Sequence, residues 1–416
     1  MGADLSAHFP RYTDFDPLVP VHCVTPELEG AFHRFFDTSP ISPSGRYLGV
    51  TRLLVEDRPP QPGDVAEVVL VDLETGETRV LAETQGWDTQ LGAQVQWGPT
   101  DQQLFFNDMD TTAWRPFGVK LDPLTGERQE LEGTVYMVSP NGRWAASPCL
   151  LRTAVTQAGY GVITPPEQVP LNEGASPDDG VYLTDTQTGC SRLLVSLQEI
   201  FETATPRLDP AEYQEGAFYA FHVKWNPRST RIMAVVRFKQ HDTGKIAAHD
   251  AVTMNADGSG LHVAIPASEW TGKGGHHPNW CPDGEHVMIN LKIHGDKLRF
   301  VRARYDGSDY GAMSETLEGS GHPSMHPDGR HIVTDVYPGR PLAYEDGTVP
   351  IRLADIATGE DLELVRIQSV PAYSGENHEL RVDPHPAWDY DFRRVAFNAC
   401  PDGTRRVYVA DCSQYL

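Results

Sequence analysis

The sequence predicts an all-β protein, a seven-bladed β-propeller that forms a single domain over residues 1–416. Three observations predict this fold. A turn with the pattern Pro-Asp/Asn/Ser-Gly recurs along the chain, a second tight turn follows most copies, and the seventh unit stops one strand short. Units of roughly forty to sixty residues with four short strands are typical of propeller blades.

The first turn has an apolar residue two places before its Pro, and a strand rich in Val, Ile and aromatic residues follows it. We call this apolar residue the leading residue of its blade. Seven copies are present, although the last has lost the Pro. The leading residues are Ile41, Trp97, Val138, Trp225, Trp280, Met325 and Trp388.

The second turn ends a strand with Asp, Asn and Gly, which tolerate the positive φ angles of hairpin turns. Its copies include VDLETGETRVL, LDPLTGERQEL, MNADGSGLHVAI and LADIATGEDLELV. Together the two turns divide the chain into blades at about 35–84, 92–132, 133–197, 218–267, 275–319, 320–370 and 380–416.

The last unit contains only three strands before the sequence stops at Leu416. Residues 19–25, Val-Pro-Val-His-Cys-Val-Thr, precede the first unit and have no partner there. We expect them to form the fourth strand of blade seven and close the ring, because closure removes exposed sheet edges.

The formal charge of −24 disfavours nucleic acid and anionic membranes as partners, since the overall field repels both. The six cysteines lie far apart, which is typical of small core residues in a reducing compartment. The first residues lack a signal-peptide pattern, and no apolar run is long enough to span a bilayer. These features predict a cytoplasmic protein.

A histidine recurs three residues before the leading residue in the last four blades. The residues at this position are Thr38, Gln94, Val135, His222, His277, His322 and His385. The position begins the innermost strand, so these side chains are expected to face the central channel and form an arc.

Clustered neutral imidazoles are a common site for transition metals. The first three blades do without this histidine, so the blade itself does not require it. The alternative is that each histidine serves only the hydrogen bonding of its own blade. Further ligands or supporting residues are available nearby in sequence: Glu376, Asp383, His276, His326 and His378. Of these, His326 lies inside a turn and is expected to be a surface residue.

Long loops are expected on the same side as these histidines, and long loops in compact domains often carry function. They are Glu56–Val65, Thr153–Asp179, Lys239–His249 and Pro338–Val349. The strands that feed them end in Arg52, Arg152, Arg237, Lys239, Lys292 and Tyr337. These residues predict a locally cationic rim that would bind a carboxylated ligand.

The repeats resemble those of TolB-like propellers. Four segments, Phe-His-Arg-Phe-Phe at 32–36, His-His-Pro-Asn at 276–279, Gly-His-Pro at 321–323 and Asp-Pro-His-Pro at 383–386, narrow the likeness to the oligogalacturonate lyase family. That resemblance implies a seven-bladed propeller with a divalent metal, usually manganese, held by channel-facing His and Gln. Zinc, iron, nickel or calcium are the alternatives for this chain.

Carried onto this sequence, the resemblance implies metal ligands at His277 and His385, with His222 as the catalytic base. The chain departs from the family pattern in the last blade, where Leu380 replaces a Gln and Asp383 replaces a His. His322 and Asp383 would restore the number of ligands.

The implied reaction is β-elimination on a small uronate-containing oligosaccharide. Arg237 and the metal would stabilise charge on the carboxylate while His222, kept neutral by cationic neighbours, removes the C5 proton. The substrate-binding residues expected are Arg34, Arg152, Lys239, Lys292 and Tyr337. Two alternatives stay open: a non-catalytic scaffold or sugar-binding module, and a metal-dependent isomerase, epimerase or hydrolase of a sugar derivative.

Overall fold

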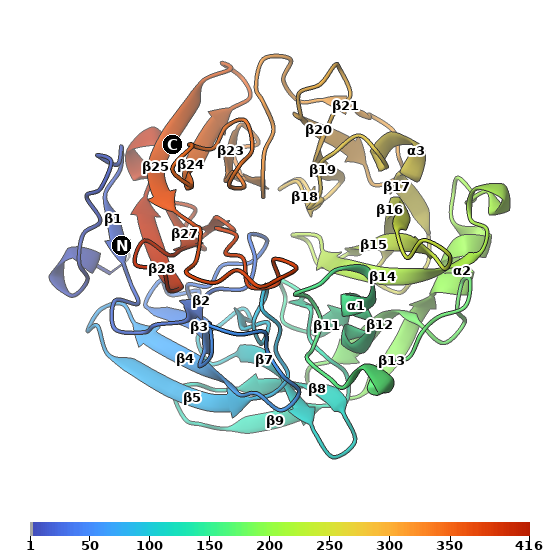
Figure 1. The fold of residues 1–416 in the computed structure, drawn as a ribbon, viewed down its shortest axis with the longest axis horizontal. Helices are drawn as coiled ribbons and strands as arrows, with labels where there is room; N and C mark the ends of the chain where they lie inside the picture. The colour runs from blue at the N-terminus through green and yellow to red at the C-terminus, as the bar shows by residue number, and fades with distance from the viewer. Residues whose placement is uncertain (1–2) are drawn as a thin grey trace.

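In the computed structural model, which describes residues 3–416, the chain forms seven four-stranded antiparallel sheets arranged around a central channel (Figure 1). The seven-bladed propeller expected from the repeats is therefore confirmed. Blade one contains β2 (Ala31–Phe32), β3 (Tyr47–Leu53), β4 (Ala66–Asp72) and β5 (Thr78–Thr84). Blade two contains β6 (Gln96–Trp97), β7 (Leu104–Asp110), β8 (Arg115–Leu121) and β9 (Arg128–Leu131). Blade three contains β10 (Met137–Val138), β11 (Trp144–Ser147), β12 (Gly180–Asp185) and β13 (Ser191–Ser196).

The later blades repeat the same order from the channel outward. Blade four contains β14 (Gly216–Trp225), β15 (Arg231–Gln240), β16 (Ile246–Asn255) and β17 (His262–Ile265). Blade five contains β18 (Asn279–Trp280), β19 (His286–Leu291), β20 (Arg299–Arg304) and β21 (Gly311–Ala312). Blade six contains β22 (Ser324–Met325), β23 (His331–Thr334), β24 (Thr348–Asp355) and β25 (Asp361–Gln368).

Blade seven contains β26 (Ala387–Trp388), β27 (Arg394–Ala399), β28 (Arg406–Asp411) and, as its outermost strand, β1 (Val21–Cys23). Val21 pairs with Ala410 and Cys23 with Tyr408. The predicted closing segment 19–25 is thus confirmed, with the paired strand at its centre.

The remaining elements are short helices in the connections. They are α1 (Leu150–Thr156), α2 (Leu197–Thr203), α3 (Ala267–Trp270) and the 3-10 turns η1 (Leu5–Ala7), η2 (Pro166–Gln168), η3 (Pro210–Glu212) and η4 (Ser413–Tyr415). No helix within residues 3–416 combines the length and the apolar character needed to cross a bilayer.

The innermost strand of blade one starts at Ala31, where the blade was expected from about residue 35, and that of blade four starts at Gly216, where the blade was expected from about 218. One expectation about a loop needs correction. The expected loop Lys239–His249 is mostly strand, because β15 and β16 stay paired from Lys239 with Ile246 onward and leave a tight hairpin. Alternating apolar residues extend both strands beyond the predicted ends.

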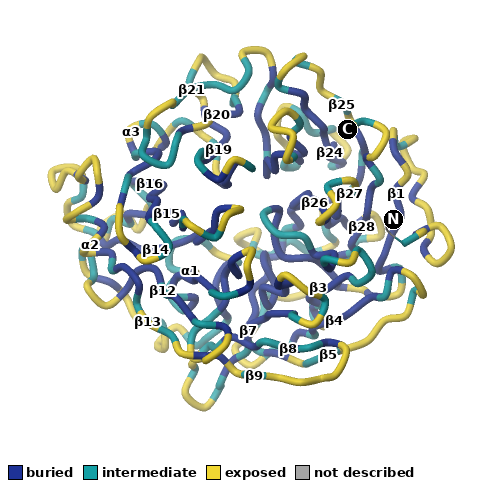
Figure 2. Tube along the Cα trace, turned by 180° about the vertical axis from the view of Figure 1, so that it is seen from behind, coloured by how far each residue is buried: buried dark blue, intermediate teal, exposed yellow. Residues whose placement is uncertain are grey.

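Tryptophans at the leading position join neighbouring blades. Nε1 of Trp97 donates to the carbonyl of Pro40, and Nε1 of Trp280 donates to that of Lys224. Trp388 donates in the same way to Ser324. Each acceptor directly precedes the leading residue of the blade before, so one side chain fixes the spacing between two sheets. Buried inner and middle strands contrast with exposed outer edges and turns (Figure 2).

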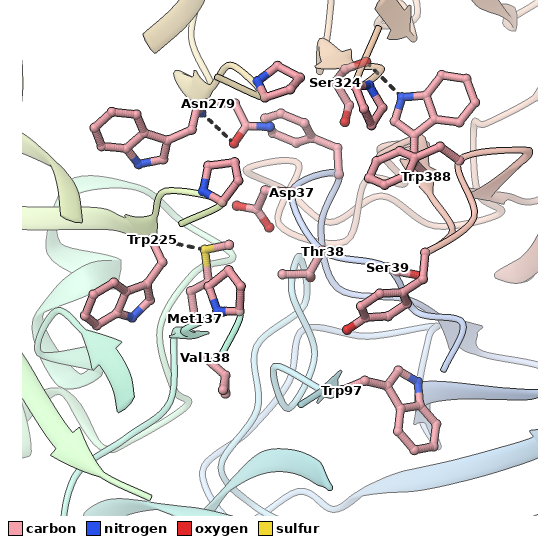
Figure 3. A pocket seen from close by; sticks show the side chains of 18 of the residues that line it. Asp37, Thr38, Ser39, Trp97, Met137, Val138, Trp225, Asn279, Ser324 and Trp388 are labelled. Carbon is pink, nitrogen blue, oxygen red and sulfur yellow. Dashed lines mark hydrogen bonds between the residues drawn. The ribbon is translucent and has the colours of Figure 1, made fainter. Parts of the chain in front are cut away.

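The channel has two distinct ends. We call the end formed by the turns after the leading residues the turn mouth, and the end where the chain enters the innermost strands the loop mouth. A cavity of about 470 Å³ opens at the turn mouth, surrounded by leading residues of several blades, with Asp37 near its centre (Figure 3). The side chains of Phe35 and Phe36 are 0% and 1% exposed, and Phe36 contributes to the wall of this cavity.

Candidate metal and catalytic site

Unusual backbone geometry aims the histidines at the loop mouth. His277 and His385 adopt positive φ angles of 64° and 50°, and Gln94 at the same position in blade two has 61°. Such angles are uncommon for residues other than Gly and persist only where surrounding structure holds them. The repeat therefore supplies a bent entry into each of these strands, and that entry turns the side chain inward.

His222 reaches the channel by a different route. It does not begin its strand, as the sequence pattern suggested, but lies near the middle of β14. Ala220 pairs with Val236 and Val223 pairs with Ala234, so Phe221 and His222 together face Val235. This is a β-bulge, which re-aims side chains next to functional sites.

The four histidines form the expected arc, and Phe35 lies among them. Ring centroids of His277 and His322 are 4.1 Å apart, and those of His322 and His385 are 4.3 Å apart. His222 is 5.8 Å from His277. The Phe35 ring lies within 4.7–5.6 Å of all four imidazoles. The phenyl group thus forms the floor of the cluster and separates it from the turn-mouth cavity.

Asp335 and Tyr337 hold the central histidine. Nδ1 of His322 lies 2.9 Å from Oδ2 of Asp335, and Oδ1 of the same carboxylate accepts from the backbone N–H of His322 at 2.7 Å. Oδ2 of Asp335 also accepts from the backbone N–H of His385 at 3.1 Å. The Tyr337 hydroxyl lies 2.7 Å from Nε2 of His277 and 3.1 Å from Nε2 of His322.

Three predicted ligands converge tightly enough to hold one ion. One ligand atom from each of His322, Asp383 and His385 lies within 4.8 Å of the others, and all three residues are buried. Among residues 3–416, neither ring nitrogen of His385 has a hydrogen-bond partner although the side chain is 1% exposed. Buried polar atoms without partners are unfavourable, so this donor set fits a divalent transition ion.

His277 stands beside this group but is not part of it. Its Nε2 is engaged with the Tyr337 hydroxyl, while its Nδ1 finds no partner within the described chain. Movement of the tyrosine hydroxyl would free Nε2 of both His277 and His322 toward the same space.

The surroundings of His222 suit a neutral imidazole. Burial is the largest cause that lowers its pKa well below the usual value, and the charges of Lys224, Arg237 and Arg34 lower it further. The expectation that cationic neighbours keep it neutral is therefore correct in direction but names the smaller cause. The Tyr136 hydroxyl forms a hydrogen bond with Nδ1, so the orientation of the ring is fixed.

Most of the expected cationic rim is engaged within the protein. Arg34 pairs with Asp37 at 2.7 Å, and Arg152 pairs with Asp179 at 3.6 Å. Lys239 donates to the carbonyl of Val155 at 2.6 Å, at the end of α1. These residues position loops and charges and do not present a free cationic surface.

Arg237 is engaged as well, because its NH1 group lies 3.4 Å from the backbone carbonyl and the hydroxyl of Thr156. Cζ of Arg237 lies 3.6 Å from the centroid of the Phe221 ring, and Phe221 directly precedes His222 in the sequence. Burial lowers the pKa of Arg237 to about 10. Lys292 and Tyr337 differ from that group. Lys292 is exposed at the end of β19. Tyr337 is the one predicted substrate-binding residue that contacts the histidine cluster directly.

A cation that the sequence pattern did not single out stands beside the ligands. Nε of Arg381 lies 3.0 Å from Oδ2 of Asp383, and its NH2 group lies 3.4 Å from the Tyr160 hydroxyl. Asp335, Tyr136 and Arg381 were all missed because they do not recur between blades. Tyr136 directly follows Val135, the blade-three counterpart of the histidines, and that adjacency was the available signal.

The connection between β25 and β26 crosses the loop mouth (Figure 1). Nε2 of Gln90, in the connection between blades one and two, donates to the carbonyls of Glu379 and Arg381 at 3.0 and 3.1 Å. Gln90 leads into blade two, and residues 379–381 lead into blade seven. Blade one lies between these two blades in the ring, so residues 379–381 span part of the opening above the histidines. We call residues 371–386 the covering segment.

No family model matches the sequence, and no curated protein matches it either. Several solved structures are similar to this chain. An oligogalacturonate lyase in complex with manganese superposes with a TM-score of 0.65 and 16% identity, covering 97% of this chain and 96% of that one. An oligogalacturonate lyase from Vibrio parahaemolyticus superposes with a TM-score of 0.66 and 15% identity, and the match covers 99% of this chain and 97% of that one.

The fold is similar to that of oligogalacturonate lyases. The β-propeller domain of the Trilobed protease from Pyrococcus furiosus is also similar, with a TM-score of 0.52, 10% identity and coverage of 92% and 96%. At these identities the likeness supports the propeller fold alone, and the seven blades are those of the sheets described above.

Proposed function

We propose that this protein is a metal-dependent lyase that cleaves small uronate-containing oligosaccharides by β-elimination. The observation that carries the proposal is the convergence of His322, Asp383 and His385 beside a neutral, oriented His222. Within residues 3–416, neither ring nitrogen of His385 has a hydrogen-bond partner. The overall likeness to two oligogalacturonate lyases, one of them a manganese complex, supports it.

His322, Asp383 and His385 would hold the ion, with His277 as a further ligand. A divalent ion bound there supplies positive charge that stabilises the enolate-like charge on the substrate carboxylate. Arg381 donates to Asp383, His378 and Tyr160, so it would act on the substrate carboxylate through its nearby positive charge and not through a free guanidinium. That charge would supply part of what the sequence assigned to a wider rim of cations.

His222 would remove the proton at C5 of the uronate. When Nδ1 carries the hydrogen and donates it to the Tyr136 hydroxyl oxygen, Nε2 keeps a lone pair for the substrate. As the C5–H bond breaks, a double bond forms between C4 and C5, the C4–O bond breaks, and the leaving sugar oxygen takes up a proton. The low pKa of His222 keeps the base unprotonated at neutral pH.

The reaction is tested with galacturonate oligosaccharides, Mn²⁺ and the purified protein, by following the ultraviolet absorbance of the unsaturated product. Absorbance should rise with wild type and stay flat with His222→Ala and after chelation. Silence on galacturonate, glucuronate and iduronate oligosaccharides alike would contradict the lyase.

One observation favours a second candidate, a non-catalytic propeller. His222, His322 and His385 are at most 2% exposed and pack around Phe35 within the core. In that case the cluster would hold blades together, and the protein would bind no metal at the loop mouth. Metal analysis of protein purified without a histidine tag separates the two candidates, because only the lyase requires an ion that His385→Ala removes.

A further inference from the structure

A second group of potential ligands lies in the first turn of blade six, at the turn mouth. Nδ1 of His326 is 3.0 Å from Oδ2 of Asp328, and Nδ1 of His331 is 2.6 Å from the same oxygen. One ligand atom from each of the three residues lies within 4.8 Å of the others. The imidazoles are 16% and 12% exposed and the carboxylate 33%, so the two rings are largely enclosed while Asp328 is open to solvent.

The equivalent turn of blade five shows which part of this arrangement belongs to the turn itself. There Nδ1 of His286 lies 2.6 Å from Oδ2 of Asp283, as His331 does with Asp328. The position of His326 is occupied by the buried Cys281. A histidine–aspartate contact is therefore common to both turns, whereas the second imidazole is particular to blade six.

The hydrogen bonding of His326 leaves an electron-rich gap. The backbone N–H of Asp328 donates to Nδ1 of His326 at 3.2 Å, so this nitrogen acts as an acceptor and carries its lone pair. The same nitrogen lies 3.0 Å from Oδ2 of Asp328. A ring nitrogen without a hydrogen and a carboxylate oxygen repel each other, so an ion that replaced the backbone N–H as the partner of Nδ1 would stabilise this pair. Nδ1 of His331 is also within hydrogen-bond distance of this oxygen, so an ion bound here would take the place of the hydrogen on Nδ1, which would then be carried by Nε2 of that ring.

We propose that His326, Asp328 and His331 bind a divalent transition ion of the zinc class, with water completing the shell. Ligand atoms about 2.0–2.2 Å from a tetrahedral Zn²⁺ lie about 3.3 Å from one another. The 3.0 Å contact already matches that separation, and the 2.6 Å contact needs to widen by well under an ångström. Two imidazoles and one carboxylate with open positions form a donor set that zinc favours.

This site is independent of the loop-mouth histidines and of the proposed lyase reaction. The ring of His326 packs against Trp388 at 5.3 Å and Phe392 at 5.8 Å, both in blade seven. These two residues and Pro327 line the turn-mouth cavity. An ion bound here would tie the blade-six turn together beside the junction with blade seven and at the edge of that cavity.

Blade four supplies a substitution that preserves the turn. Asn226 stands at the position of His326, and its Oδ1 accepts from the backbone N–H groups of Thr230 and Arg231 at 2.9 and 3.0 Å. His326→Asn is therefore expected to keep the backbone while it removes the imidazole. His286→Ala in blade five is the matched control, because that turn has a histidine–aspartate contact without a second imidazole.

The experiment titrates metal-free protein with Zn²⁺, and with Co²⁺ as a spectroscopic probe, in a His322→Ala/His385→Ala background that removes the loop-mouth site. One equivalent should bind, with the visible absorption of tetrahedral Co²⁺, and His326→Asn should weaken binding by about tenfold or more. His286→Ala should leave binding unchanged. Equal binding with and without His326, or equal loss with His286→Ala, overturns the site. If the background variant does not fold, wild type should bind one equivalent more than His326→Asn, and equal stoichiometry overturns the proposal.

Discussion

Asp335 accepts from Nδ1 of His322 at 2.9 Å, which leaves Nε2 of that ring turned toward the other ligands. A carboxylate behind a ligating histidine fixes its tautomer and raises its basicity. Asp335→Asn should therefore lower affinity for Mn²⁺ at the loop mouth by about 10–100-fold while His322 stays in place. Equilibrium dialysis measures the effect, and Asp346→Asn at a surface turn is a suitable control. Unchanged affinity would show that His322 is not a ligand.

The contact between Tyr136 and His222 should matter for turnover and not for metal binding. Tyr136→Phe removes the hydroxyl that orients Nδ1, and we expect kcat to fall by about 10²-fold, within the range for acid–base catalysis. Metal content should stay at the wild-type level in this variant and in His222→Ala. If His222→Ala loses metal instead, the residue is a ligand and another group is the base.

Buried neutral histidines should make the metal-free protein sensitive to acid. Burial lowers the pKa of His33 to about 3, and it lowers the pKa values of His222, His277 and His385 well below 6.5. Above pH 6.5 neither the folded nor the unfolded chain protonates these rings. Below it the unfolded chain takes up protons that the folded chain does not, so the free energy of unfolding falls as pH falls.

Each histidine should contribute a slope of about 1.4 kcal/mol per pH unit, or about 5 kcal/mol per unit for the four together. Asp88 and Asp250 offset part of this slope, because burial raises their pKa values to about 7 and about 6 and the folded chain then takes up protons in the same range. Urea unfolding at several pH values between about 7.5 and 5.5, roughly one unit either side of the free histidine pKa, checks this. A flat profile across that range would mean that the rings protonate equally in both states.

Phe35 should be the most costly single truncation near the site. Its side chain is 0% exposed and touches all four imidazoles, while Nζ of Lys224 lies 4.8 Å from its centroid. Phe35→Ala should lower the free energy of unfolding by about 3–5 kcal/mol. Phe35→Leu should recover more than half of the loss. Chemical denaturation distinguishes these outcomes, and a loss below about 1 kcal/mol would contradict close packing.

The covering segment should open more readily when Gln90 is shortened. Gln90→Ala removes both side-chain hydrogen bonds to residues 379 and 381. Backbone amides of 374–382 should then exchange about 2–12-fold faster, as expected for about 0.5–1.5 kcal/mol of lost stabilisation. Gln85→Ala is the control, because that side chain bonds to Gly63 elsewhere. Equal exchange in both variants would show that Gln90 does not restrain the segment.

The fold was predictable because its signals are local. Each first turn is readable over a few residues, and the unpaired segment 19–25 needed a partner that only the incomplete last blade offers. The arc of histidines followed from the same repeat. What could not be predicted depends on contacts between distant residues, such as Asp179 with Arg152 or Asp37 with Arg34, which neutralise the expected cationic rim.

Other features that the sequence did not predict also depend on contacts between distant residues. The bulge at His222 is a mismatch between two strands and has no sequence signature of its own. Asp335 and Arg381 act once each and do not recur, so a comparison of blades passes over them. Phe35 was part of a recognised motif, but its place among four imidazoles depends on the geometry of the closed ring.

The pairing of β1 with β28 also constrains the order of folding. Val21 and Ala410, which face each other in this ladder, are 389 positions apart along the chain (410 − 21). During synthesis β1 emerges before the six blades that precede blade seven, and it cannot pair with β28 until that strand has left the ribosome. Ring closure is therefore a late, slow step with a high contact order. A nascent chain stalled before residue 406 would present two open sheet edges to its neighbours.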